Sequence, residues 1–271
     1  MKCPGTQVLK YPMMNKDRHR QLLLVLVGTF AIALIVATLS ADDAPTSEAT
    51  GDHSRNATAV ASESRPVSGS DAATDAQGLV RVGNLVYGNN QTSVCFAEGF
   101  LVAVARETDI HVKRTYDTVR LGSADMFSYP MLIFSGEGEF ALNEGDVASL
   151  ADYLTRGGFV LASPGCSNAG WFVSFNKAMR EVAPEAQWRT LPMSHPLFRM
   201  VYNVETIRLK HPSANTKLRG IFLGDRLAVL FSPQGLNDTA AAGKGCCCCG
   251  GNEIRNASQI NANVLTYVLT H

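Results

Sequence analysis

The sequence predicts an α/β domain with a mostly parallel sheet, preceded by one membrane-spanning helix. Residues 129–170 read as strand, turn, helix, Gly-Gly stop and strand, which is the pattern of a βαβ crossover. Strand and helix patterns go on alternating on both sides of this block, as expected for a parallel sheet. Residues 21–41 form an uncharged apolar run, and roughly 20 helical residues suffice to cross a bilayer core.

Composition restricts the classes of function. The 271 residues allow one sizeable domain, and their formal net charge is zero. Charged residues make up 18% of the chain, so no large basic field is available for nucleic acid. The sequence lacks GxGxxG, Walker A, HExxH and GxSxG motifs. We therefore expect no nucleic-acid partner, no cofactor and no metal.

The N-terminal part predicts export of the rest of the chain. Residues 1–20 are basic near the apolar run, and acidic residues follow it, so the positive-inside rule places the N-terminus in the cytoplasm. An uncleaved anchor over 21–41 is preferred to a cleaved signal because the run is longer than a signal's apolar core. Residues 42–77 are rich in Ala, Ser, Thr and Asp and are expected to form a disordered linker.

The domain is expected to occupy residues 78–271. Residues 79–87 alternate as a strand, 92–107 read as a helix with Thr92 as its N-cap, and 110–116 read as a second strand. Residues 129–135 are nearly all apolar, as in a strand that is covered on both faces.

The second half of the domain continues the alternation. Asn143 is a candidate N-cap for a helix that ends at Gly157-Gly158, and a buried strand follows at 159–162. Asn168 is a candidate N-cap for another helix. Residues 220–231 predict a hairpin around Gly224-Asp225, and the apolar spacing over 260–268 predicts a closing helix.

Four segments resemble a bacterial family, domain of unknown function 4159. They are YPMLIFSGEGEF, VASLADYLTRGGFVLAS, MSHPLF and NANVLTYVLT. The resemblance implies a flavodoxin-like three-layer sandwich similar to class I glutamine amidotransferases. In those proteins a strand ends in a sharp turn that carries a nucleophilic cysteine. Many relatives carry acidic residues just after that strand, where this chain has Ser163-Pro164.

Three residues are candidates for catalysis. Cys166 lies between a strand and a helix, where backbone N–H groups favour a thiolate. His195 is a candidate base for that thiol, although Pro196-Leu197 follows it instead of the Pro-Glu typical of amidotransferases. Glu137 lies in the turn after another strand. A packed turn cysteine, a structural His-Pro turn and a solvated carboxylate are the simpler interpretations.

A ligand site is expected where parallel strands end. Its candidate residues are Gly136, Gly138, Ser163, Ser167 and Asn168. The incomplete catalytic set favours a non-catalytic binding or assembly module with envelope partners. The alternative is a thiol-dependent amidase or acyl-transfer hydrolase with Cys166 as nucleophile and His195 as base. The sequence leaves open whether the protein is an enzyme.

Four adjacent cysteines, 246–249, lie between glycines. Structural zinc sites use spaced pairs of cysteines because adjacent side chains diverge, so a metal site is not expected here. In an oxidising exported compartment, a disulfide from this loop to Cys95 or Cys166 is one possibility, and idle thiols are the other.

Overall fold

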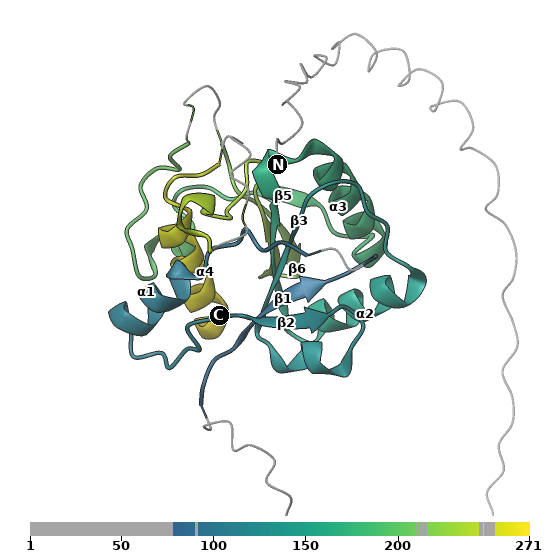
Figure 1. The fold of residues 1–271 in the computed structure, drawn as a ribbon, viewed down its shortest axis with the longest axis horizontal. Helices are drawn as coiled ribbons and strands as arrows, with labels where there is room; N and C mark the ends of the chain where they lie inside the picture. Colours follow the sequence, from purple (N-terminus) through teal and green to yellow (C-terminus); the bar gives the residue numbers. More distant parts are fainter. Residues whose placement is uncertain (1–77, 90–91, 210, 212–215, 244–245, 247–252) are drawn as a thin grey trace, which may run out of the picture. The chain divides into compact units, whose positions relative to one another are not determined.

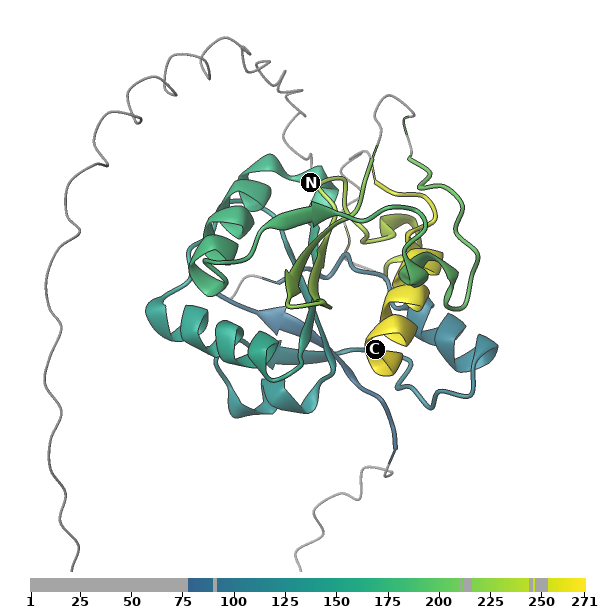
Figure 2. The same cartoon turned by 180° about the vertical axis from the view of Figure 1, so that it is seen from behind.

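A computed structural model describes residues 78–89, 92–209, 211, 216–243, 246 and 253–271 (Figures 1 and 2). The predicted segments at 1–20, 21–41 and 42–77 lie outside these residues. The strands are β1 (Val82–Val86), β2 (Asp117–Arg120), β3 (Met131–Gly136), β4 (Phe159–Pro164), β5 (Trp188–Thr190), β6 (Arg219–Leu223) and β7 (Arg226–Phe231). The α-helices are α1 (Gly99–Glu107), α2 (Glu144–Thr155), α3 (Ala169–Val182) and α4 (Ala257–Thr270).

The strands form one seven-stranded sheet in the order β2-β1-β3-β4-β7-β6-β5. The five strands from β2 to β7 run parallel, β6 is antiparallel to both of its neighbours, and β5 lies at the edge. Met131 pairs with Phe159 and Gly136 with Pro164, so β3 and β4 end side by side. The predicted mostly parallel α/β sheet is therefore confirmed.

Helices cover both faces of the sheet (Figures 1 and 2). On one face, α1 and α4 pack against buried residues such as Val82, Ile133 and Leu161. On the other face, α2 and α3 pack against Phe134, Val160 and their neighbours. Adjacent strand residues alternate between these two cores because side chains of a strand point to opposite faces.

The predicted start signals of α2 and α3 and the predicted stop signal of α2 are confirmed. Asn143 accepts a hydrogen bond from the backbone N–H of Asp146, and Asp146 reaches back to the N–H of Asn143, which forms a capping box. Asn168 caps α3 by accepting from the N–H of Trp171 at 2.8 Å. Past the end of α2, Gly157 adopts a φ of 104°, a conformation that favours glycine.

Two predicted elements are wrong in extent. The helix expected over 92–107 begins only at Gly99, because backbone hydrogen bonds and a disulfide hold residues 93–98 in a loop. The strand expected over 110–116 is replaced by β2, whose Asp117 accepts hydrogen bonds from Arg81 at 2.8 Å and from Lys113. Residue Val112 contributes only an isolated bridge to Val80.

Candidate functional site

The turns that follow β3 and β4 form the centre of the candidate site. Glu137 follows β3 directly, and Gly165, Cys166 and Ser167 form a short 3₁₀ turn between β4 and α3. Because the last residues of β3 and β4 are paired, these two turns emerge next to each other. We call this group of turns the carboxyl edge.

Cys166 lies in an unusual backbone conformation. Its φ is 52° and its ψ is 29°, and Ser167 follows with a φ of 55°. Non-glycine residues rarely occupy this left-handed region, and when they do they are often found at functional sites. The conformation turns the chain sharply from β4 into α3. The cysteine side chain is consequently partly exposed on the carboxyl edge.

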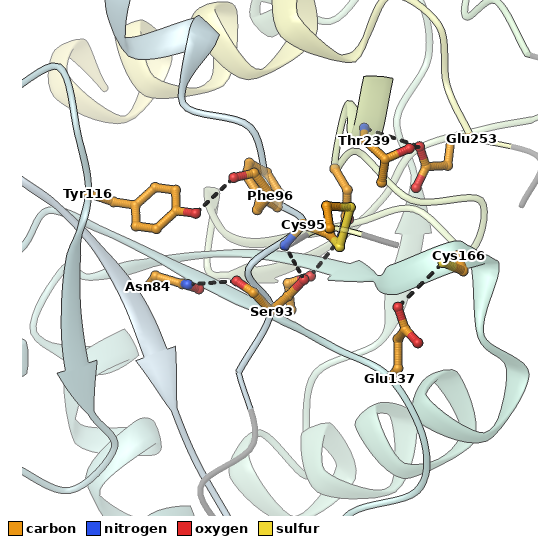
Figure 3. The surroundings of a disulfide bond; sticks show 12 residues. Asn84, Ser93, Cys95, Phe96, Tyr116, Glu137, Cys166, Thr239 and Glu253 are labelled. Carbon is orange, nitrogen blue, oxygen red and sulfur yellow. Dashed lines mark hydrogen bonds between the residues drawn. A yellow bond between two sulfur atoms is a disulfide. The ribbon is translucent and has the colours of Figure 1, made fainter. Parts of the chain in front are cut away.

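Glu137 and Cys166 are brought together (Figure 3). The thiol Sγ donates a hydrogen bond to Oε1 of Glu137 at a distance of 3.3 Å. A Cβ atom at Gly165 would lie 2.7 Å from Cγ of Glu137, so the glycine leaves room for the Glu137 side chain beside Cys166. Two of the three catalytic candidates predicted from the sequence therefore share one place.

His195, the third candidate, lies at the opposite end of the sheet. Its ring is 6.4 Å from the ring of Phe222 and 5.4 Å from that of Tyr267. Phe222 pairs with Leu227 near the start of β7, which runs parallel to β4. At about 3.3 Å per residue, that level lies roughly 20 Å along the strands from the end of β4. The predicted pairing of Cys166 with His195 as its base is not assembled in this structure.

Burial lowers the pKa of His195, and the charge of His271 lowers it further. Nδ1 of His195 accepts the backbone N–H of Leu197 at 3.2 Å, while Leu197 and Phe198 are fully buried. These contacts match the simpler interpretation of the sequence, in which the histidine stabilises a turn that buries two apolar residues.

The predicted ligand-binding residues occupy different depths. Ser167 and Gly138 are partly exposed at the carboxyl edge, whereas Gly136 is buried beneath it. A Cβ at Gly136 would meet the hydroxyl of Tyr87 at 2.2 Å, which explains the glycine. Asn168 uses its side-chain oxygen to cap α3. Ser163 is fully buried, so it supports the edge from below.

A row of buried polar side chains underlies the edge, and the sequence patterns did not reveal it. Ser135 and Ser163 are paired across β3 and β4, and both are fully buried. Asn237, also fully buried, donates from Nδ2 to Oγ of Ser135 at 3.1 Å and accepts from Oγ of Ser163. The backbone N–H of Leu236 donates to Oγ of Ser163 at 2.7 Å. In the sequence, this row was indicated only by a serine near the end of β3 and another near the end of β4.

The loop of residues 232–238 links this row to the surface. Oγ of Ser167 donates to the carbonyl oxygen of Gln234 at 2.8 Å. At Gly235, φ is 90° and a Cβ would lie 2.8 Å from the carbonyl oxygen of Pro164, so glycine is required for this close approach. The loop therefore fixes the end of β4 and the turn that carries Cys166.

A disulfide joins Cys95 to Cys246, with a Cα–Cα distance of 4.8 Å. This bond confirms one of the partners that the sequence left open for the 246–249 loop. Cys247, Cys248 and Cys249 lie outside the described residues. Within the residues that the structure describes, no three potential metal ligands gather into a cluster.

A cavity of about 330 Å³ opens beside the ends of β1 and β3. Its lining consists of Gly88, Asn89, Asp146 and residues 139–143. The strand order changes direction between β1 and β3, since β2 lies on one side of β1 and β3 on the other. Open α/β sheets bind ligands at such switch points, outside the carboxyl ends of the strands.

Among the residues that are described, no helix has the length and apolarity to cross a bilayer. The predicted span at 21–41 is not among these residues.

Comparisons with known proteins place the domain in a family. No curated protein matches the chain. The family model "Domain of unknown function (DUF4159)" matches residues 81–269, which is nearly all of the domain and confirms the resemblance seen in the sequence. This chain therefore belongs to the DUF4159 family.

Proposed function

We propose that the protein is a membrane-anchored envelope component whose exported, amidotransferase-like α/β domain is a non-catalytic binding or assembly module. The hydrogen bond between Cys166 and Glu137 is the observation that carries this proposal. The bond uses the protonated thiol, whereas the nucleophile in thiol catalysis is the thiolate.

The carboxyl edge offers features that suit binding. Glu137 and Glu139 are exposed beside the cavity near β1 and β3. Carboxylates at an edge favour partner groups that donate hydrogen bonds or carry positive charge. The buried row of Ser135, Ser163 and Asn237 holds the edge in one arrangement, and preorganisation reduces the entropy lost on binding.

Site-specific cross-linking in the full chain tests this function. A photoactivatable residue replaces Glu139 at the carboxyl edge, and a matched variant carries it at Asp225. Both positions are exposed, but Asp225 lies in the β6–β7 turn at the opposite end of the sheet. We expect a discrete cross-linked partner from intact membranes with the first variant only. Equal cross-linking from both positions, or cross-linking from Asp225 alone, would falsify the proposal.

A second candidate is a thiol-dependent amidase or acyl-transfer hydrolase, and the backbone of Cys166 favours it. A residue with positive φ between a strand and a helix resembles the strained turn that presents a nucleophile. Glu137 would then act as the base in place of His195. Alkylation with iodoacetamide near neutral pH separates the candidates. The binding module predicts that Cys166 reacts no faster than free cysteine, and the enzyme predicts clearly faster reaction.

A further inference from the structure

The Cys95–Cys246 disulfide connects two loops on the same side of the sheet. Cys95 belongs to the loop between β1 and α1, and Cys246 belongs to the loop between a 3₁₀ turn at Thr239–Ala241 and α4. The two cysteines are separated by 151 residues in the sequence. The bond therefore links two segments that are distant in the sequence and that local structure would not hold together.

Hydrogen bonds connect the loop around Cys95 to the strands (Figure 3). Asn84 on β1 donates from Nδ2 to the carbonyl oxygen of Ser93 at 2.9 Å, and the backbone N–H of Cys95 donates to Oγ of Ser93 at 3.1 Å. The hydroxyl of Tyr116 donates to the carbonyl oxygen of Phe96 at 2.9 Å. The loop is thus positioned by buried polar contacts as well as by the disulfide.

The same loop reaches the candidate site through Asn237. The backbone N–H of Ala97 donates to the carbonyl oxygen of Asn237 at 2.8 Å. The Asn237 side chain bonds Ser163 on β4, and the neighbouring Gln234 accepts from Ser167, next to Cys166. A continuous series of contacts therefore runs from the disulfide to the carboxyl edge.

The two sulfur atoms differ in access. Cys95 is 5% exposed, whereas Cys246 is partly exposed. A soluble thiol consequently reaches the disulfide from the Cys246 side. Attack by a thiolate requires such access to a sulfur atom, so Cys246 is the position at which exchange begins.

We propose that the Cys95–Cys246 disulfide is a redox-responsive clasp on the carboxyl edge, closed when oxidised and opened by a dithiol reductant. In the reduced state the loop at 93–98 loses its covalent constraint. The loop at 232–238, which it contacts through the bond between Ala97 and Asn237, and the turn that carries Cys166 and Ser167 then loosen with it. This regulation rests on the proposed function, because the edge it controls is the proposed binding site.

The opening reaction consumes one dithiol. One thiolate of the reductant attacks Sγ of Cys246, the disulfide breaks, and Cys95 leaves as a thiolate that takes up a proton. The second thiol of the reductant then resolves the mixed disulfide, which releases the Cys246 thiol. Two electrons and two protons pass from the dithiol to the protein, and the two sulfur atoms of the dithiol become joined in an intramolecular disulfide.

The rest of the domain has its own support. On the other face of the sheet, Nε1 of Trp171 donates to the hydroxyl of Tyr87 at 2.6 Å, and that hydroxyl donates to the carbonyl oxygen of Ser135 at 3.2 Å. The α2–α3 side also packs around an apolar core that includes Phe134 and Phe175. Opening of the clasp is therefore expected to stay local.

Amide hydrogen exchange on the full chain tests the clasp. Cys247, Cys248 and Cys249 are replaced by Ser to prevent scrambling, and peptides are followed with and without dithiothreitol. We expect exchange in peptides covering 93–98 and 232–238 to accelerate by at least about tenfold on reduction, because local openings control exchange. A peptide covering 147–161 should not change. Reoxidation should restore the slow exchange.

The matched control adds Cys95→Ser to the same background. In this control the peptides covering 93–98 and 232–238 should exchange fast with and without dithiothreitol, since it has no disulfide to reduce. Unchanged exchange after mass spectrometry has shown the bond to be open contradicts the clasp. If exchange accelerates in the peptide covering 147–161 as well as in those covering 93–98 and 232–238, the clasp is also contradicted. The disulfide would then stabilise the whole domain instead of a local part of it. Neither outcome depends on a ligand, so the binding proposal is judged separately by its cross-linking experiment.

Discussion

At the scale of single residues, position in the fold decided which predicted groups meet. Glu137 and Cys166 are far apart in the chain but follow paired strands, so a hydrogen bond can join them. His195 was predicted as the base for Cys166, yet it packs against Phe222 and Tyr267 at the other end of the sheet. The pattern of residue types identified these three side chains as candidates. Only the direction of the strands showed at which end of the sheet each of them lies.

His195 gives a prediction for the pH dependence of stability. Its folded-state pKa is lowered by burial and by His271, whereas in the unfolded chain a histidine has a pKa of about 6.5. The unfolded state therefore binds protons more tightly, and acidification through and below about pH 6.5 destabilises the fold. His195→Asn keeps an acceptor for the N–H of Leu197 and removes the titrating ring. Its free energy of unfolding in urea should fall less than that of the wild type between about pH 7.5 and 5.5.

The exposed His111 supplies the control for this measurement. His111→Asn should lose stability on acidification as the wild type does. If His195→Asn keeps the full wild-type dependence on pH, the burial of the ring does not contribute to acid sensitivity.

At the scale of elements, the sequence predicted the start of a helix correctly where the capping residue lies next to the helix in the chain. Asn143 and Asn168 both cap the helices that the sequence assigned to them. The expected cap at Thr92 failed because the disulfide of Cys95 and the bond from Ala97 to Asn237 stabilise a loop over the same residues. These partners lie more than a hundred residues away in the sequence, outside any local pattern.

The end of α2 carries a prediction about a long-range cap. Arg226, at the start of β7, donates from its guanidinium to the carbonyl oxygens of Gly157 at 3.2 Å, Gly158 at 3.0 Å and Leu154. Arg226→Met should lower the free energy of unfolding by about 1–2 kcal/mol, because partly buried carbonyls lose their donors. Urea denaturation measures the loss.

Arg180→Met is the matched control in the last turn of α3, where the side chain is exposed. It should change stability by no more than about 0.5 kcal/mol. Equal effects of the two substitutions would show that the Arg226 contacts contribute nothing specific.

At the scale of the whole molecule, the sequence predicts a membrane anchor in front of the domain. Residues 21–41 carry no charge, and the domain matched by the family model begins only at residue 81. We predict that the protein extracted from membranes keeps its N-terminal 41 residues. Intact-mass measurement checks this directly. A mass that corresponds to a chain beginning near residue 42 would establish a cleaved signal instead.

The sequence by itself determined the α/β class, the βαβ block around β3 and β4, both capped helices and the family, because these depend on local periodicity and neighbouring residues. The tertiary structure alone decided that Glu137 meets Cys166, that Asn237 ties Ser135 to Ser163, and that Cys95 pairs with Cys246. Such contacts join segments distant in the chain. Their formation depends on sheet order and strand direction, which the cooperative packing of both cores fixes.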